Sequence, residues 1–80
     1  MRKLTVLSRS YCHLCDDLIA ALEEFQGRFS SGFEVEIIDV DAHPELETKW
    51  GDKVPVLLEA ETEICHYFFD QTALIARLSQ

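Results

Sequence analysis

Hydrophobic residues follow two different spacings along the chain, and the changes between them predict seven secondary-structure elements. Residues 3–8 are rich in β-favouring side chains and predict a first strand. From Cys12 onward the apolar residues recur every three or four positions, which indicates one face of a helix that ends at residues 27–32. The residues on this face are Leu14, Leu18, Leu22, Phe25 and Phe29.

Residues 33–40 predict the second strand, and a short helix follows it. The end of this strand is apolar on both faces, which is typical of a central strand covered by helices on each side. The residues concerned are Phe33, Val35 and Ile37 on one face and Ile38 and Val40 on the other. The short helix begins near Pro44, which suits a first helical position, and stops at Gly51. Leu46 and Trp50 are its expected apolar anchors.

The last part of the chain predicts a hairpin and a helix. Strands at residues 54–59 and 64–68 are joined by a short connection and therefore pair as antiparallel neighbours. Asp70 is a good N-cap for the last helix. The residues of this helix expected to pack inward are Leu74, Ile75 and Leu78. The order β-α-β-α-β-β-α predicts one α/β domain over residues 1–80, with a mixed four-stranded sheet between layers of helices.

The composition is that of a globular domain with a strongly acidic charge. Of the 80 residues, 48% are hydrophobic, and 15 acidic against 7 basic side chains give a net charge of −8. This charge argues against nucleic acid and anionic membranes as partners. No apolar run approaches the roughly 20 residues of a membrane span. Residues 1–3 precede too short an apolar stretch for a secretory signal, so we expect a cytoplasmic protein, and a monomer.

The acidic excess is confined to one part of the sequence. Residues 34–63 contain ten acidic and two basic side chains, whereas the charges on either side of them balance. Residues 1–15 carry Arg2, Lys3 and Arg9 and no acidic side chain. The net charge therefore describes an acidic flank, open to basic partners, rather than the segment that carries the candidate chemistry.

That chemistry lies in a Cys-x-x-Cys motif, Cys12 to Cys15, at the junction of the first strand and the first helix. A thiolate at Cys12 would face unpaired backbone N–H groups and the positive end of the helix dipole, which lower the pKa of a thiol. Cys15 lies one turn deeper, where it could attack a mixed disulfide formed at Cys12. Arg9 adds positive charge, while Asp16 and Asp17 act in the opposite direction.

Two other interpretations of the cysteine pair stay open. The pair could be half of a zinc site completed by Cys65 with His66 or His43, although the sequence lacks a second paired knuckle. Alternatively, the two cysteines could be buried structural thiols. Their place between a strand and a helix favours redox chemistry. Cys65, on a predicted strand, is expected to be a small buried hydrophobe.

The pair Val54-Pro55 is the second chemical signal. Proline at the entrance of a strand is unusual because it removes a donor from the sheet. A trans bond is the ordinary expectation for such a proline. A cis bond would instead present the backbone of Val54 beside the cysteines, and the residues alone do not choose between the two.

Taken together, these features make the sequence resemble a glutaredoxin-like member of the thioredoxin superfamily over nearly the whole chain. The resemblance rests on residues 9–15, residues 39–46, the Val54-Pro55 pair and Asp70. It implies a thioredoxin-like three-layer α/β/α sandwich and a cis peptide bond before Pro55. It also implies that Cys12 is the attacking thiol and Cys15 the resolving thiol.

The same resemblance implies a substrate site around the cysteines. Val54 would offer its backbone to an extended cysteine-containing substrate, a form of strand addition. Arg9 is similar to the basic position that supports glutathione and the thiolate in glutaredoxins, and Tyr11 stands where thioredoxins have tryptophan. Asp70 is a candidate contact for the glutathione amino group as well as a helix cap. The expected substrate-binding residues are Arg9, Tyr11, Val54, Pro55 and Asp70.

Glutathione use is where the sequence departs from glutaredoxins. Glutaredoxins bring a Gly-Gly pair close to glutathione just before the last helix, whereas residues 66–69 here are His-Tyr-Phe-Phe, which block close backbone approach. The usual proline is absent from the Cys-x-x-Cys motif, and Lys53 replaces a small hydroxyl residue. We expect weak glutathione binding, with glutathione as a candidate reductant and no tightly bound cofactor.

The sequence therefore predicts a thiol–disulfide oxidoreductase that acts on a protein or small-molecule disulfide. The alternative is a non-catalytic thioredoxin-fold module that binds a protein partner through its acidic surface and altered groove. Tyr67, Phe68 and Phe69 are expected to form core and groove wall, while His43 and His66 are expected at the surface.

Overall fold

A computed structural model describes residues 2–29 and 32–80, and it contains the seven predicted elements in the predicted order. The elements are β1 (Arg2–Ser8), α1 (His13–Arg28), β2 (Phe33–Asp39), α2 (Pro44–Trp50), β3 (Val56–Glu59), β4 (Thr62–His66) and α3 (Gln71–Leu78). Short 3-10 turns at Val40–Ala42 and Gly51–Lys53 flank α2. Pro44 lies in the first turn of α2, as its fixed φ angle predicts.

The four strands form one mixed sheet in the order β2-β1-β3-β4. β1 is parallel to β2 and antiparallel to β3, and β3 is antiparallel to β4. The prediction that β2 is a central strand is therefore wrong, because β2 lies at an edge. Ile37 is 51% exposed there, and Val40, although buried, belongs to the 3-10 turn rather than to the strand.

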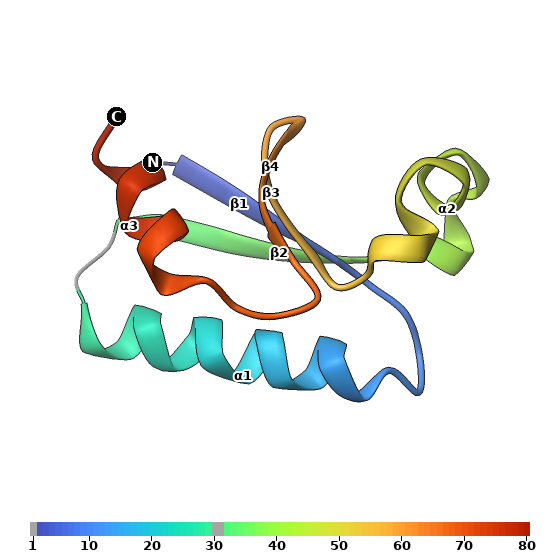
Figure 1. Ribbon diagram of the computed structural model, residues 1–80, viewed down its shortest axis with the longest axis horizontal. Helices are drawn as coiled ribbons and strands as arrows, with labels where there is room; N and C mark the ends of the chain where they lie inside the picture. Colours follow the sequence, from blue (N-terminus) through green and yellow to red (C-terminus); the bar gives the residue numbers. More distant parts are fainter. Residues whose placement is uncertain (1, 30–31) are drawn as a thin grey trace.

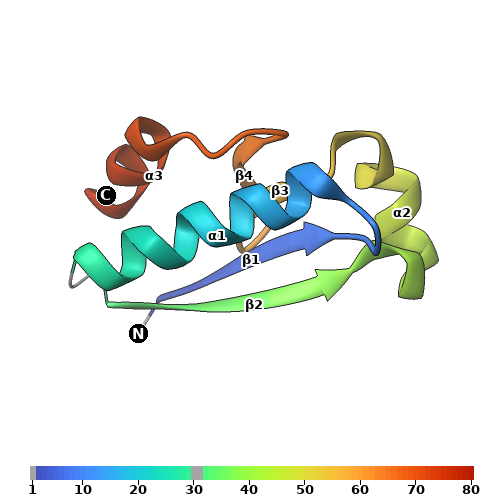
Figure 2. The ribbon, with the colours of Figure 1, turned by 90° about the horizontal axis from the view of Figure 1, so that it is seen from below.

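Two apolar clusters, one on each face of the sheet, confirm the three-layer arrangement (Figures 1 and 2). Helices α1 and α3 cover one face, and α2 packs against the other with Leu46 and Trp50. The first cluster contains Leu4, Val6, Leu18, Leu22, Phe25, Phe33, Leu57, Cys65 and Leu74. The second contains Leu7, Val40, Val56 and Leu58. Successive strand residues alternate between the clusters, as the period of a strand requires.

Several expected boundaries and packing positions differ from the structure. The last strand covers Thr62–His66 rather than 64–68, because Tyr67 has a φ of 64° that ends the extended backbone. In α3, Leu74 is buried and Leu78 packs on the core one turn later, but Ile75 is 45% exposed because it lies on another side of the helix.

The two ends of α1 also differ from the prediction. Leu14 and Phe29 are exposed rather than buried, because the sheet covers only the middle of the helix. The helix continues through Gly27 to Arg28. The predicted stop at residues 30–31 lies outside the described residues.

An ion-pair cluster joins the N-terminal strand, β3 and α3. Arg2 donates two hydrogen bonds, 2.6 and 2.7 Å long, to Glu59, and Arg77 donates another at 2.6 Å to the same carboxylate. Arg2 also donates to the backbone carbonyls of Arg77 and Leu78. These hydrogen bonds from Arg2 and Arg77 lower the pKa of Glu59 to about 2. No helix in the described part of the chain is long and apolar enough to cross a membrane.

Candidate functional site

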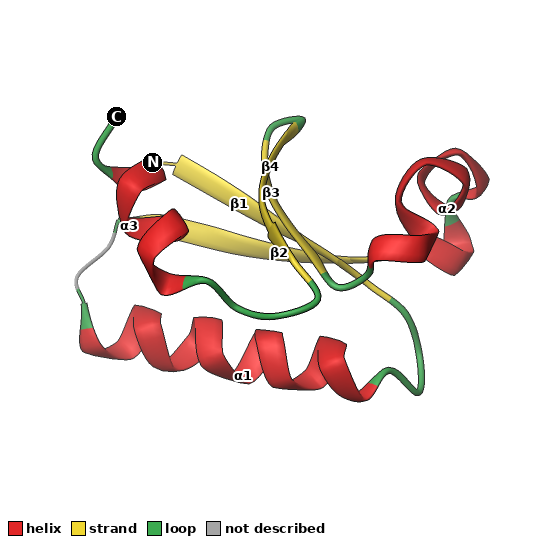
Figure 3. Ribbon diagram, viewed as in Figure 1, coloured by secondary structure: helices red, strands yellow, loops and turns green. Residues whose placement is uncertain are grey.

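Three segments that are distant in sequence lie together at one end of the sheet. Leu7 pairs with Val56, and Val56 pairs with His66, so these residues form one row across β1, β3 and β4. The turn into α1, the entrance to β3 and the loop after β4 all continue from this row, and the ribbon shows them converging (Figures 1 and 3). The fold therefore gathers the Cys-x-x-Cys motif, Val54-Pro55 and residues 67–69 at one end of the sheet.

The two cysteines of the motif are joined in a disulfide at the start of α1. Cys12 is the N-cap residue with extended backbone, and Cys15 lies within the first turn, 5.2 Å away between Cα atoms. Cys15 is buried, whereas Cys12 is partly exposed. The backbone N–H of Cys15 donates to Sγ of Cys12 at 3.1 Å, a contact that would stabilise negative charge on that sulfur when the pair is reduced.

Arg9 does not stand as a free cation beside the motif. Its Nη2 lies 2.6 Å from Oε2 of Glu47 on α2 and 3.5 Å from Oδ1 of Asp41. The hydrogen bond to Glu47, with weaker contributions from nearby carboxylates, raises the pKa of the Arg9 guanidinium. Arg9, three residues before Cys12, is therefore paired with acidic side chains from the 34–63 segment.

Gly51 makes room for this ion pair, a role that the sequence did not reveal. A β-carbon at position 51 would collide with the carboxylate of Glu47 and would lie 3.2 Å from Nη2 of Arg9. The sequence suggested only that Gly51 stops α2. A glycine directly after a short helix is a local stop signal that the sequence itself displays. The close packing of Gly51 against Glu47 depends instead on where α2 lies relative to Arg9 in the folded chain.

Tyr11, directly before the first cysteine, has a φ of 58° and a fully exposed side chain. Left-handed backbone is uncommon for residues other than glycine, asparagine and aspartate. Leu14, inside the motif, is also exposed. The start of α1 thus presents two apolar side chains to solvent beside Cys12.

Val54 and Pro55 are joined by a cis peptide bond, as the resemblance implied, and the ordinary trans expectation is wrong. Pro55 is buried and Val54 is partly buried with extended backbone. Tyr67 contacts this segment twice. Its N–H donates to the carbonyl oxygen of Pro55 at 2.8 Å, and its hydroxyl donates to the carbonyl oxygen of Asp52 at 2.8 Å.

The aromatic stretch divides in a way that the sequence did not predict. Phe69 packs on the first core cluster, in edge contact with Phe25. Tyr67 is exposed, and Phe68 is 68% exposed, so Phe68 is not part of the core. The available signal was the absence of the Gly-Gly pair that glutaredoxins have in this stretch. Glycine positions often have unusual backbone, and Tyr67 in this stretch has a positive φ.

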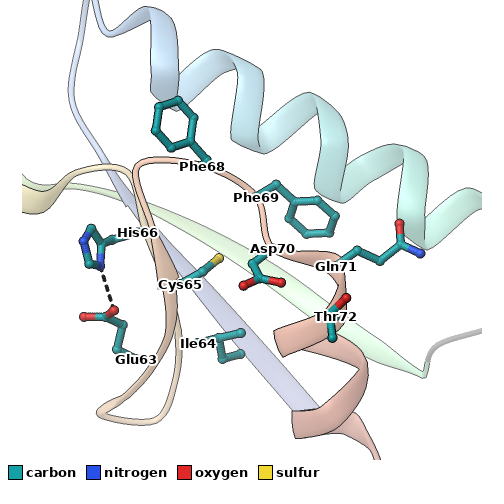
Figure 4. Close-up of a pocket in the computed structure, with 9 residues that line it drawn as sticks. All are labelled: Glu63, Ile64, Cys65, His66, Phe68, Phe69, Asp70, Gln71 and Thr72. Carbon is teal, nitrogen blue, oxygen red and sulfur yellow. Dashed lines mark hydrogen bonds and ion pairs between the residues drawn. The ribbon is translucent and has the colours of Figure 1, made fainter.

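Asp70 lines an open pocket of about 560 Å³ between β4 and α3 (Figure 4). Its Oδ1 accepts the backbone N–H of Ala73 at 3.0 Å, which confirms the helix cap. Cys65 lies in the same pocket wall and is only 8% exposed, as expected for a small hydrophobe. Burial raises the pKa of the Cys65 thiol. His66, which points away from Cys65 in Figure 4, pairs with Glu63 at 2.8 Å.

The zinc set considered from the sequence is not assembled in the described residues. Within residues 2–29 and 32–80, no three side chains of His, Cys, Asp or Glu gather closely enough to hold a metal ion. Cys65 is a free thiol on β4, whereas Cys12 and Cys15 are bonded to each other on α1. His43, the other candidate ligand, is exposed at the start of α2.

Comparison with known proteins gives the family. Residues 3–79 match the family described as Glutaredoxin-like domain (DUF836). Protein Ne2328 from Nitrosomonas europaea is 42% identical, with a TM-score of 0.82 over 95% of this chain and 89% of that chain. Protein XcR50 from X. campestris is 30% identical, with a TM-score of 0.73 over 95% of both chains.

A more distant structure shows the fold alone. E. coli glutaredoxin is 19% identical, with a TM-score of 0.59 over 96% of this chain and 93% of that chain. A comparison with curated proteins found no match. With its four-stranded sheet, its three helices and its Cys12–Cys15 pair, the chain belongs to the glutaredoxin-like domain family within the thioredoxin-like fold.

Proposed function

We propose that this protein is a thiol–disulfide oxidoreductase in which Cys12 attacks and Cys15 resolves. The observation that carries the proposal is the asymmetry of the pair. Cys12 is partly exposed at the N-cap of α1, and Cys15 is buried within bonding distance of it. A nucleophile must reach an external disulfide, whereas a resolving thiol needs to reach only the first cysteine.

In the reducing direction, the Cys12 thiolate attacks one sulfur of the substrate disulfide and displaces the other sulfur as a thiolate, which takes up a proton. Cys15 then loses its proton and attacks Sγ of Cys12, which releases the second substrate thiol. The substrate gains two electrons, and the protein is left with the Cys12–Cys15 disulfide. An external thiol reductant must then return the pair to its reduced form.

The substrate of this reaction is a protein or small-molecule disulfide, and the proposed setting is a reducing compartment, the cytoplasm. Glutathione is a weak ligand in this proposal, since residues 66–69 are His-Tyr-Phe-Phe in the stretch where glutaredoxins have a Gly-Gly pair. No tightly bound cofactor is required, because sulfur carries the electrons. Titration with reduced glutathione is expected to give millimolar or weaker affinity, and submillimolar binding would contradict this part of the proposal.

Single-cysteine variants test the proposal. Cys15→Ser should trap substrates as mixed disulfides on Cys12, and Cys12→Ser should abolish the reduction of a peptide disulfide. Cys65→Ser is the matched control, because Cys65 is the free cysteine, and it should leave both results unchanged. Reduction that survives in Cys12→Ser would overturn the proposal. Partner capture that survives in the Cys12→Ser, Cys15→Ser double variant would instead indicate the non-catalytic binding module.

A further inference from the structure

The loop from β4 to α3 is held at several points. Tyr67 is fixed by its two hydrogen bonds to Pro55 and Asp52. Phe69 packs into the core, with its ring centroid 6.1 Å from that of Phe25. Asp70 caps α3 immediately afterwards. Between these fixed points, Phe68 is the residue whose side chain stays mostly in solvent.

The backbone that presents Phe68 is itself unusual. The N–H of Phe68 donates to the carbonyl oxygen of His66 at 2.7 Å, which closes a three-residue turn around Tyr67. The positive φ of Tyr67 corresponds to the rare and strained form of this turn. Strained backbone in a well-held loop is often found where a protein binds a ligand. The turn keeps the large apolar side chain of Phe68 exposed, although burial of that side chain would stabilise the folded protein.

The exposed side chain of Phe68 lies on the side of the loop that faces α1. Figure 4 shows its ring directed toward the first turns of α1, while the sulfur of Cys65 points the other way, toward Asp70. The loop also begins one residue beyond the row that aligns β1, β3 and β4. Both ribbon views place it beside the N-terminal half of α1 (Figures 1 and 2).

Four exposed apolar side chains lie at the end of the sheet that carries the disulfide, and we call this group the apolar rim: Tyr11, Leu14, Tyr67 and Phe68. Two come from the start of α1, and two come from the loop that is bonded to the cis-proline segment. A substrate disulfide that reaches Cys12 can bring its neighbouring residues against this rim. Polar neighbours gain little from such contact, whereas apolar neighbours lose water-exposed surface.

We infer that the preferred substrate is a polypeptide disulfide with an apolar residue next to the reactive cysteine, and that Phe68 is the residue that selects it. This inference rests on the proposed function. It names the substrate class within that reaction and adds no step to it. Phe68 acts by contact with the substrate side chain, and the chemistry stays with Cys12 and Cys15. Removing an apolar contact of this kind commonly changes discrimination by about tenfold.

Two synthetic peptides provide the test. Each carries one cysteine as a mixed disulfide with 2-nitro-5-thiobenzoate, flanked by leucine in the first peptide and by serine in the second. Pre-reduced protein is mixed with each peptide, and release of the coloured thiol gives a second-order rate constant. Division by the rate with dithiothreitol removes differences in intrinsic reactivity. The wild-type protein is expected to react about ten times faster with the leucine peptide.

Phe68→Ala is expected to reduce this preference to about twofold or less, chiefly by slowing the leucine peptide. Phe68→Leu should keep most of the preference, because it keeps an apolar side chain. Phe29→Ala is the matched control, since Phe29 is an aromatic that is 43% exposed at the far end of α1. It should leave both rates unchanged. Alkylation of Cys12 by iodoacetamide should also be unchanged in Phe68→Ala, which a general loss of structure would not allow.

The outcomes separate the inference from the proposed function. Equal rates for the two peptides with the wild-type protein would overturn the inference, and so would an equal loss of both rates in Phe68→Ala. In either case the proposed oxidoreductase activity would stand. Rates no higher than those of Cys12→Ser with both peptides would instead overturn the proposed function, and the inference would fall with it.

Discussion

Nη2 of Arg9 lies 2.6 Å from Oε2 of Glu47, so the guanidinium three residues before Cys12 is bound to α2. The two residues are 38 positions apart in the sequence. Asp41 adds a second carboxylate at 3.5 Å, and Gly51 leaves the space that the pair occupies. The electrostatic environment at the start of α1 therefore depends on residues of the acidic 34–63 segment.

Removal of the Glu47 charge should make Cys12 more reactive. Glu47→Gln removes the charge of the nearer of the two carboxylates that pair with Arg9, and the loss of this negative charge from this end of the sheet favours the Cys12 thiolate. We expect alkylation of reduced protein by iodoacetamide at neutral pH to become about twofold faster, and Arg9→Gln to make it slower. Glu24→Gln is the control, because Glu24 pairs with Arg28 at the far end of α1. Identical rates in all variants would contradict this view of Arg9.

The Arg2–Glu59–Arg77 cluster should make stability depend on pH in the acidic range. The hydrogen bonds from Arg2 and Arg77 lower the pKa of Glu59 from 4.5 to about 2, so the folded state favours the ionised carboxylate. This stabilisation is present above about pH 4.5 and is lost as the pH falls toward 2. Chemical unfolding of the wild-type protein should show the decline within this window.

Glu59→Gln tests the same cluster at neutral pH. We expect the free energy of unfolding to fall by about 1–2 kcal/mol at pH 7, because two arginines lose a shared charged acceptor. The variant should also show a weaker decline in stability between pH 4.5 and 2. The exposed pair Glu24–Arg28 provides the comparison, and Glu24→Gln should cost less than about 0.5 kcal/mol. A similar small cost for Glu59→Gln would contradict a stabilising cluster.

Asp70 is expected to contribute to stability through its helix cap. Asp70→Ala removes the acceptor for the Ala73 N–H and should lower the free energy of unfolding by about 1 kcal/mol. Asp70→Asn keeps a capping oxygen and should restore most of that stability. The two variants also separate capping from substrate contact. If Asp70→Asn is stable but reacts more slowly with glutathione disulfide, the carboxylate of Asp70 also contacts the substrate.

Cys65 should be an unreactive thiol in the folded protein. It is buried, and that burial raises the pKa of its thiol. In oxidised protein, where Cys12 and Cys15 are bonded to each other, a thiol reagent such as 5,5′-dithiobis(2-nitrobenzoic acid) should react slowly under native conditions. The reaction should become fast in denaturant, and Cys65→Ala should abolish it. Fast reaction in the native protein would contradict the structural role of Cys65.

Local features of the site were predictable because neighbouring residues produce them. The place of Cys12 before a helix, the cap at Asp70 and the first-turn position of Pro44 each depend on a few adjacent residues. The burial of Cys65 agreed with the ordinary behaviour of a free cysteine on a strand. The exposed Phe68 was not predictable in this way, because an aromatic run resembles core until the turn at Tyr67 is known.

The sequence by itself determined the α/β element order, the Cys-x-x-Cys motif at the start of the first long helix and the acidic character of residues 34–63. These properties follow from residue spacing and side-chain type over short distances. Only the tertiary structure decided that β2 lies at an edge, that Arg9 pairs with Glu47 and that Phe68 is exposed on a loop beside α1. Each of these depends on which distant segments pack together. A periodic pattern of hydrophobic residues predicts that a surface is buried, but it does not indicate which segment packs against that surface.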